Sequence, residues 1–291
     1  MLRTIPREVA IRFKRIGDPV ETMKVRRQKA LLNSMIDQTK NRDPVSLSDR
    51  VRAIILGSIL GDGSLKLNEG YRNARFSFRH SVVQEEYFRW KVDQLKDISS
   101  ESSVFRQADD GGYSKNEKLR YQSRALELLT EIFRLANQRN QFHIRRKWLN
   151  MLTPLSLAVW WLDDGSIVGN ARKGVLCTDG FEKESVIVLA QYLEKVWKVR
   201  THVGVIGRRR DSRRPQYYRL WFSTEELKKF LRVILPHIKV QSMLPKVILL
   251  YNDPELQERW ISEVVVLTKF PRQVVEQIVL QKKQKWKRFR E

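Results

Sequence analysis

Two aspartates in this sequence have the surroundings expected of metal ligands. Asp62 ends the run Ile-Leu-Gly-Ser-Ile-Leu-Gly that begins at residue 55, and Asp164 ends the run Leu-Ala-Val-Trp-Trp-Leu-Asp that begins at residue 157. Glycine and serine follow both aspartates. An apolar run predicts a buried helix or strand, where a carboxylate is costly unless it is paired or binds metal. One such run alone could also be a helix end or a turn, in which Asp-Gly is common.

The small residues of the first run indicate how two such elements could meet. Gly57 and Gly61 are four residues apart and therefore lie on one face of a helix. Two apolar helices that pack through such a face would bring Asp62 and Asp164 together at their C-terminal ends. The two carboxylates would repel each other and the helix dipoles, and a divalent cation would relieve this repulsion. Oxygen ligands without a nearby cysteine or histidine favour a hard ion such as Mg²⁺, or Mn²⁺.

Both runs resemble the LAGLIDADG motif of the homing endonucleases and their relatives. In register, Asp62 and Asp164 match the second aspartate of the motif, which binds metal in that family. The resemblance implies that the backbone carbonyls of Gly61 and Asp163 are further metal ligands. Asp163 stands where the motif usually has a small residue, and we expect its side chain to cap a helix or to point to solvent.

The resemblance also implies a basic residue, usually lysine, near each metal site. Lys246 matches one of these positions by its Met-x-x-Lys setting, and an offset of one hundred residues places Arg146 at the other, with Lys147 next to it. Arginine orders water and stabilises an oxyanion, but it does not become a neutral base. Full activity on one strand is therefore in question. The alternative for residues 145–147 is simple phosphate binding.

The elements that would position these residues repeat at an offset close to one hundred. Ser48 has the character of an N-cap for a helix over residues 50–60. The expected elements that follow it are a strand at 74–80, a helix at 82–96, strands at 103–107 and 119–123, and a helix at 125–136. Their later counterparts are a strand at 174–178, a helix at 182–197, and strands at 201–206 and 216–222. This pattern predicts an α+β fold of two tandem, pseudo-symmetric αββαββα units, and such pseudo-symmetry suits duplex DNA.

We expect the first repeat to cover residues 49–150 and the second to cover 151–270, with mixed or antiparallel sheets forming a DNA-binding saddle. Residues 1–48 form a basic N-terminal extension, which is either a solvated helical arm or a phosphate-contacting segment. Residues 271–291 form a basic C-terminal tail. For this tail we favour a disordered charged segment over a basic helix end.

DNA recognition is expected on the two hairpins, because a two-stranded ribbon fits the major groove with alternate side chains facing the bases. The run at residues 208–210 is typical of a solvated loop that contacts phosphates, so we assign base contacts only to strand residues. The candidate DNA-binding residues are Arg106, Lys115, Lys118 and Arg120 in the first hairpin and Arg208, Arg209, Arg210, Arg213, Arg214, Tyr218 and Arg219 in the second.

The composition points to a polyanionic partner. The chain of 291 residues carries 56 Lys and Arg against 33 Asp and Glu, a formal charge of +23, and this charge is spread along the whole length. Nucleic acid is therefore the first candidate partner, and a membrane surface is not expected. The single cysteine, Cys177, excludes an intramolecular disulfide. We expect an intracellular monomer, in an organelle matrix or a prokaryotic cytoplasm, without a secretion signal.

Three functions are compatible with these features. The first is a site-specific, intron- or intein-type endonuclease that hydrolyses both strands of a long double-stranded DNA target. The second is a maturase that binds intron RNA on the same scaffold, and some relatives perform both functions. The third is a DNA-binding regulator that has lost the chemistry, which requires degraded acids. Because Asp62 and Asp164 are both present, the first function is favoured.

Overall fold

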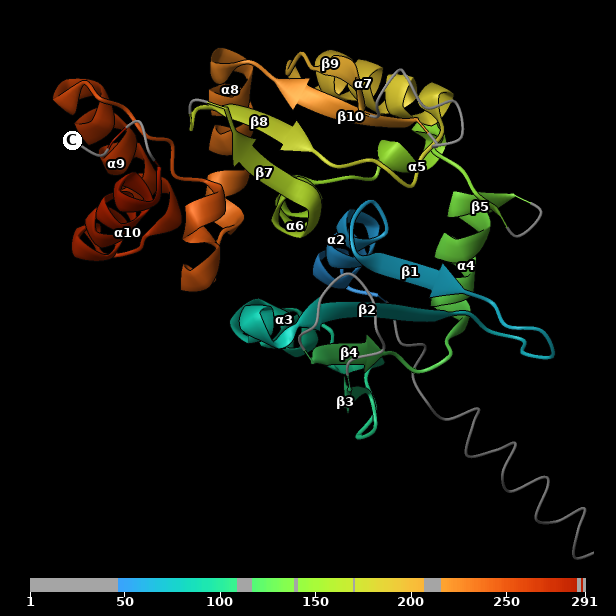
Figure 1. Cartoon of the computed structure of the whole chain (residues 1–291). Helices are drawn as coiled ribbons and strands as arrows, with labels where there is room; N and C mark the ends of the chain where they lie inside the picture. Colours follow the sequence, from blue (N-terminus) through green and yellow to red (C-terminus); the bar gives the residue numbers. More distant parts are fainter. Residues whose placement is uncertain are drawn as a thin grey trace, which may run out of the picture. The chain divides into compact units, whose positions relative to one another are not determined.

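The computed structural model describes residues 47–108, 117–138, 141–169, 171–206 and 216–286, together with residue 289. These residues form an α+β fold with two four-stranded antiparallel sheets (Figure 1). Most of the N-terminal extension, the tips of both hairpins and the last few residues lie outside the described ranges. No helix within those ranges has the length and apolarity needed to cross a membrane.

The two halves have the same order of elements. The first half consists of α2 (Asp49–Ser58), β1 (Gly63–Lys66), β2 (Arg75–Ser81), α3 (Glu85–Gln94), β3 (Val104–Gln107), β4 (Lys118–Gln122) and α4 (Glu127–Ala136). The second half consists of α6 (Pro154–Asp164), β7 (Gly165–Val168), β8 (Lys173–Leu176), α7 (Lys183–Trp197), β9 (His202–Ile206), β10 (Tyr217–Phe222) and α8 (Thr224–Ile234). The sheets have the strand orders β1-β2-β4-β3 and β7-β8-β10-β9, so the predicted duplication is confirmed.

Short elements connect these larger ones. The first half also contains the 3-10 turns η1 (Val82–Gln84) and η2 (Lys96–Ile98), the two-stranded pair β5 (Asn137–Gln138) and β6 (Gln141–Phe142), and the short helix α5 (Arg146–Leu149). The second half continues through η3 (Leu235–His237) and η4 (Gln241–Lys246) into α9 (Pro254–Thr268) and α10 (Arg272–Lys285).

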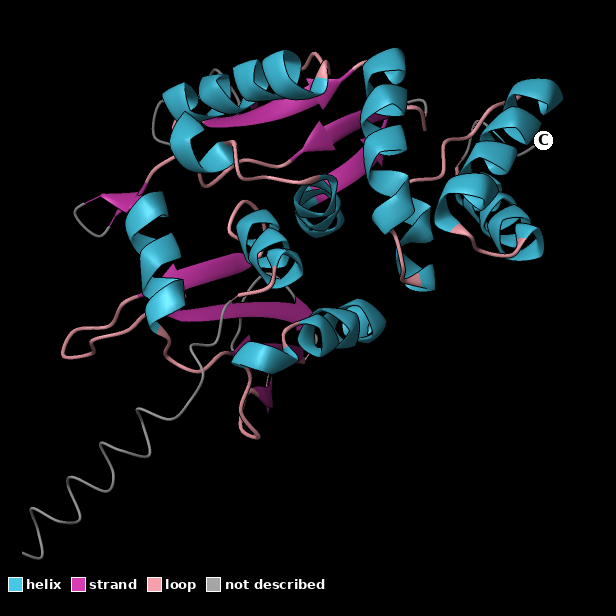
Figure 2. Ribbon diagram, turned by 180° about the vertical axis from the view of Figure 1, so that it is seen from behind, coloured by secondary structure: helices cyan, strands magenta, loops and turns pink. Residues whose placement is uncertain are grey.

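Helices α2 and α6 pack side by side (Figures 1 and 2). Each begins at a side-chain cap: the Ser48 hydroxyl accepts a hydrogen bond from the Val51 amide, and Thr153 forms a capping box with Ser156. The helices approach most closely at Gly57, where a Cβ would lie 2.3 Å from the Ser156 carbonyl oxygen. Only glycine fits there, and this close approach brings the C-terminal ends of the two helices together.

The C-terminal segment is helical, so our expectation of a disordered tail was wrong. Val275, Ile278 and Val279 in α10 are buried, and α10 packs against α9 and η4. Their spacing of three and four residues forms an apolar stripe on one side of a basic helix. The free energy gained by burying this stripe is sufficient to keep the segment helical, although lysines surround the stripe. Only the last few residues of the segment lie outside the described ranges.

Candidate active site

The ends of α2 and α6 bring the two predicted metal ligands into one site. Asp62 lies in the turn between α2 and β1, next to Gly61, and Asp164 is the last residue of α6. The Asp62 amide donates to the Asp163 carboxylate at 3.3 Å, so the two chain segments are in direct contact. The negative charge of Asp62 also acts on Asp164. The sequence therefore identified two residues that the fold does bring together.

Both carboxylates are in surroundings that oppose their negative charge. Burial, followed by the charges of Asp62 and Asp163, raises the pKa of Asp164 to about 8. Burial and the charge of Asp163 raise the pKa of Asp62 to about 6, although Lys91 and Lys246 act in the opposite direction. Within the described ranges the Asp164 side chain has no hydrogen bond or ion pair. Two carboxylates in this state favour a bound cation.

The Asp163 side chain does not cap a helix or reach solvent, so our expectation for it was wrong. Its carboxylate is fully buried and accepts hydrogen bonds from the Tyr87 hydroxyl at 2.8 Å and from Lys91 Nζ at 3.1 and 3.2 Å. Gly61 leaves the space for it, because a Cβ at residue 61 would lie 2.5 Å from the Asp163 Cβ. Asp163 therefore extends from the second half into a polar cluster of the first.

This polar cluster contains three residues that the sequence analysis missed: His80, Tyr87 and Lys91. The Lys91 side chain is fully buried, and its ammonium lies 4.5 Å from the centre of the Phe78 ring. The alternation of side chains along β2 puts His80 on the same buried face as the apolar Phe78, and this pattern in the sequence could have indicated that His80 is buried. Tyr87 and Lys91 are four residues apart on α3 and so face the same way, but nothing local indicates their partner.

His80 changes the set of possible metal ligands. Its Nδ1 lies 3.4 Å from the Asp62 carboxylate and its Nε2 lies 4.0 Å from the Asp163 carboxylate. One ligand atom from each of these three residues lies within 4.8 Å of the others. Burial and the charge of Lys91 lower the pKa of His80 to about 3, which keeps the imidazole neutral and able to bind metal. We had expected oxygen ligands without a histidine nearby, and the structure corrects this.

Lys246 lies directly at the end of α6. Its Nζ donates to the Leu162 carbonyl at 2.5 Å and to the Asp163 carbonyl at 3.1 Å. Burial lowers the pKa of Lys246, while the three aspartates of the site raise it. The ammonium therefore holds the Asp163 carbonyl that the family resemblance proposed as a metal ligand.

Arg146 and Lys147 lie apart from this arrangement. Both are exposed at the start of α5, and the Arg146 guanidinium lies 5.3 Å from the centre of the Tyr192 ring on α7. Neither residue is among the main charges that act on the pKa of Asp62 or Asp164. Arg79, which the sequence analysis did not select, is one of the charges that act on Asp62.

A polar cleft of about 310 Å³ opens beside Asp62 on the outer face of the first sheet. Its lining includes Lys66 on β1, Arg79 on β2 and Arg120 on β4, and the last two are cross-strand partners. Lys118 lies two residues before Arg120 in β4 and therefore on the same face. These cations, which lie next to the predicted metal ligand Asp62, form a site suited to a phosphate group.

Arg106 belongs to the opposite face of this sheet. It pairs across the strands with Leu119, which is buried in the core, and it forms an ion pair with Glu117 at 3.1 Å. Cross-strand partners share a face, so Arg106 cannot lie beside Lys118 and Arg120. The strand register thus puts Arg106 on a different face of the sheet from the other two predicted residues, and DNA contact by all three stays a prediction.

The second hairpin shows the same separation. Arg219 binds Asp179 with two hydrogen bonds, one of 2.6 Å. Tyr218, the preceding residue of β10, faces the other way and packs against the hydrophobic core. The two predicted DNA-binding residues of β10 therefore lie on opposite faces of the sheet, and their contact with DNA stays a prediction. Six other predicted residues lie outside the described ranges: Lys115, Arg208, Arg209, Arg210, Arg213 and Arg214.

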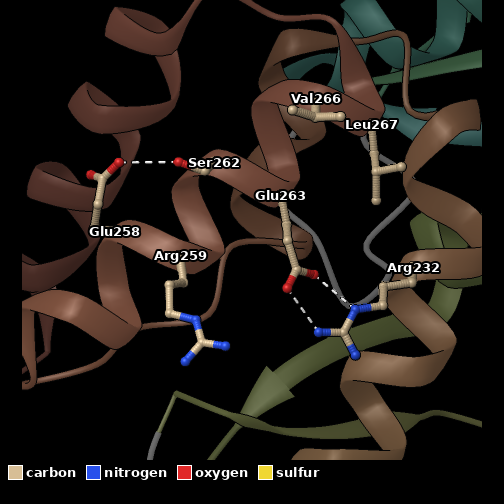
Figure 3. A pocket seen from close by; sticks show the side chains of 7 residues that line it. All are labelled: Arg232, Glu258, Arg259, Ser262, Glu263, Val266 and Leu267. Atoms are coloured by element: carbon tan, nitrogen blue, oxygen red, sulfur yellow. Dashed lines mark hydrogen bonds and ion pairs between the residues drawn. The ribbon is translucent and has the colours of Figure 1, made fainter.

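A larger cavity of about 620 Å³ lies elsewhere, along α8 and α9 (Figure 3). Three of its charged side chains have hydrogen-bond partners within the lining: Arg232 holds Glu263 with two hydrogen bonds of 2.8 Å, and Ser262 donates to Glu258 at 3.1 Å. None of the metal-ligating candidates lines it. The smaller polar cleft beside Asp62 is therefore the better candidate for chemistry.

Comparison with known proteins gives relatives for most of the described chain. The model of the LAGLIDADG DNA endonuclease family matches residues 52–230. Protein RecA of Mycolicibacterium flavescens is 28% identical over 218 residues, which are 69% of this chain and 47% of that protein. The chain thus spans about half the length of the RecA relatives it matches.

Two further curated relatives are more distant. DNA endonuclease I-ChuI of Chlamydomonas applanata is 23% identical over 168 residues, covering 54% of this chain and 77% of that protein. Cytochrome b mRNA maturase bI2 of Saccharomyces cerevisiae is 22% identical over 178 residues, covering 57% of this chain and 41% of that protein.

Among solved structures, the homing endonuclease I-WcaI bound to its DNA recognition sequence has the same fold. The alignment has a TM-score of 0.63 and 19% sequence identity, and it covers 75% of this chain and 93% of that one. The two antiparallel sheets and the central helix pair are thus a known arrangement.

Proposed function

Because the chain belongs to the LAGLIDADG DNA endonuclease family, we propose that it is a site-specific endonuclease that cuts both strands of a long DNA target. The observation that carries this proposal is the pair Asp62 and Asp164 at the adjoining ends of α2 and α6, beside a cleft lined by cations. Both halves reside in one chain, which supports action as a monomer within a cell.

The residues of the site fit a divalent cation. The pKa values of Asp62 and Asp164 are raised by burial and by neighbouring acids, so a cation would relieve an existing electrostatic strain. His80 is neutral and buried, and its Nδ1 lies 3.4 Å from the Asp62 carboxylate. Asp163, by contrast, is already neutralised by Lys91. We therefore assign Mg²⁺ or Mn²⁺ to Asp62 and Asp164, with His80 as the third ligand.

A divalent ion bound there would activate water and neutralise charge at the phosphate. Lys66, Arg79 and Arg120 would hold the phosphate group in the cleft beside Asp62. Lys246, whose pKa is lowered by burial, would orient water at the end of α6. Arg146 and the adjacent Lys147 would contact the DNA backbone rather than the reacting atoms.

The test begins with a randomised duplex library in Mg²⁺, followed by sequencing of the cut ends. On the target found in this way, Asp62→Asn and Asp164→Asn should each abolish double-strand cleavage and leave the Kd for DNA nearly unchanged. Asp93→Asn, which removes an exposed carboxylate of α3, is the matched control and should cut at the wild-type rate. Wild-type cutting by either active-site variant contradicts the assignment.

A second candidate is an RNA splicing cofactor on the same scaffold. The match to a protein named cytochrome b mRNA maturase supports it. The assay is splicing of a group I intron transcript in the presence of the protein, with Asp62→Asn as the variant. A maturase should still promote splicing after this change, because binding of RNA does not need the carboxylate. A DNA-binding regulator, the third alternative, would bind one duplex sequence tightly and cut none.

A further inference from the structure

The backbone after Lys246 is held by side chains instead of by regular secondary structure. The 3-10 turn η4 ends at Lys246, and no helix or strand begins before α9. Two carbonyls that flank Lys246, those of Pro245 and Ile248, both accept hydrogen bonds of 2.6 Å from the Nζ of Lys282. One ammonium group on α10 therefore bridges the backbone on either side of Lys246.

Other side chains hold the carbonyls between and beyond these two. Trp161 Nε1 donates to the Lys246 carbonyl at 2.9 Å, and Trp260 Nε1 donates to the Val247 carbonyl at 3.3 Å. Gln257 donates to the Leu249 carbonyl at 3.2 Å and accepts from the Tyr251 amide at 3.0 Å. Five consecutive carbonyls, from 245 to 249, thus each accept a side-chain hydrogen bond. Such groups need partners when buried, and here distant helices supply them.

Most of these donors come from α9 and α10, which lie beyond the residues matched by the family model and follow α8, the last helix in the order of elements that the two halves share. Helix α9 is tied to α8 by the paired hydrogen bonds between Arg232 and Glu263 (Figure 3). Helix α10 buries its apolar stripe against α9. The helix pair is therefore a braced support for residues 245–251.

In the described part of the chain, the equivalent segment of the first half is held by its own short helix instead. Arg146 lies in the short helix α5, where the Leu149 and Asn150 amides donate to the carbonyls of residues 145 and 146. Its backbone is therefore satisfied locally, as in any helix. Within the described ranges, the support from distant helices is therefore a feature of the half that carries Lys246.

We propose that the α9–α10 pair holds Lys246 in its working position, with Lys282 as the central positioning residue. This proposal rests on the role of Lys246 in the proposed function. Without Lys282 the carbonyls of Pro245 and Ile248 would both lose their donor, and because Ile248 is fully buried the segment would have to rearrange to hydrate the Ile248 carbonyl. Lys246 would then lose its fixed approach to the Leu162 and Asp163 carbonyls.

Lys282 has the environment of a structural group and not of a DNA contact. Burial lowers the pKa of Lys282 to about 7. A neutral amine still has two N–H donors, so both carbonyls can stay satisfied in either protonation state.

The first measurement is hydrogen exchange of the backbone amides in residues 241–251 of the full chain. Lys282→Met keeps the length of the side chain and removes its donors, and it should accelerate exchange in this segment. Lys283→Met is the matched control: it removes the same charge from the next residue, whose ammonium lies over the Phe289 ring. Equal exchange in these two variants and the wild type overturns the proposal.

The second measurement is the single-turnover cleavage rate at saturating target DNA. Lys282→Met should lower it by about tenfold to a hundredfold, the scale expected when a catalytic group is displaced by about 1 Å. The Kd for DNA should stay at the wild-type value, and Lys283→Met should cut normally. In the double variant, Lys246→Met with Lys282→Met, cleavage should be no slower than in Lys246→Met alone, because Lys282 acts only through Lys246.

The outcomes separate this proposal from the proposed function. Faster exchange with an unchanged cleavage rate overturns the positioning role, and so does an additive loss in the double variant. If Lys246→Met itself cuts at the wild-type rate, the function assigned to Lys246 fails, whereas the exchange experiment still decides whether the support exists. Trp260→Phe removes the indole N–H donor to Val247 together with part of a buried ring, and it provides a second test if Lys282→Met does not fold.

Discussion

Removal of the Lys91 ammonium should destabilise the protein more than removal of the charge of both partners in its ion pair. Lys91 and Asp163 are fully buried and 3.1 Å apart, so solvent does not screen their interaction. Lys91→Met leaves the Asp163 carboxylate with hydrogen bonds from Tyr87 and the Asp62 amide but without its nearest cation. Breaking such a pair on one side typically costs about 3–5 kcal/mol.

The structure favours the lower end of this range, because Lys246 remains as a second cation near Asp163. A loss of about 3 kcal/mol corresponds to a fall in Tm of roughly 6–12 °C for a protein of this size. In the double variant, Lys91→Met with Asp163→Asn, the amide can accept from the Asp62 amide and donate to Tyr87. The Tyr87 hydroxyl can then donate to the Val159 carbonyl, which lies 3.4 Å away. The double variant should therefore regain most of the lost stability.

The assay is urea unfolding at pH 7, followed by tryptophan fluorescence, with the midpoint and slope compared between variants. Lys96→Met, which removes an exposed ammonium paired with Asp93, is the control and should leave the midpoint unchanged. The reasoning is refuted if Lys91→Met has the midpoint of the wild type, or if the double variant is as unstable as Lys91→Met.

Three further predictions concern DNA, pH and the two strands. DNA affinity should fall steeply with salt, by a slope of about −0.9 in log K against log salt for each neutralised phosphate, and a flat profile would argue against nucleic acid. Burial raises the pKa of Asp62 to about 6 and of Asp164 to about 8, so without metal the stability these groups contribute should decline as pH rises from about 4 to about 8. Urea midpoints across this range test it, and Mg²⁺ should oppose the decline; a rise without metal would be inconsistent with the raised pKa values. Lys246→Ala should remove cutting of one strand selectively, whereas Arg146→Lys should leave the nicked phase on plasmid DNA unchanged because Arg146 lies apart from the metal-ligating residues; equal loss of both strand rates in Lys246→Ala would contradict the asymmetry.

The repeat and the paired aspartates could be predicted from the sequence because both depend on local pattern. An apolar run such as those that end at Asp62 and Asp164 predicts a buried helix from its residue types alone. The alternation of residues along β2 likewise puts Phe78 and Arg79 on opposite faces of the strand. The apolar stripe of α10 was also present in the sequence, at Val275 and Ile278, but the surrounding lysines were given too much weight.

The surroundings of the aspartates could not be predicted in the same way. Asp163 is separated from Lys91 by 72 residues, and the motif gave no reason to expect a buried carboxylate at its position. The faces of Arg106 and Tyr218 depended on cross-strand register, where a shift of one residue reverses every side chain. Arg146 was placed by its offset from Lys246, but the local backbone differs between the two halves.

By itself, the sequence determined that two apolar runs end in aspartate, that each precedes an antiparallel sheet, and that the chain is strongly basic. These properties follow from residue type and from spacing along the chain, since helix and strand periodicity are local. Only the tertiary structure decided that Asp163 pairs with Lys91, that His80 lies beside Asp62, and that Lys282 holds the segment after Lys246. Each of those contacts joins residues distant in sequence, and each buried polar group takes whichever partner the packing of the helices brings within hydrogen-bonding distance.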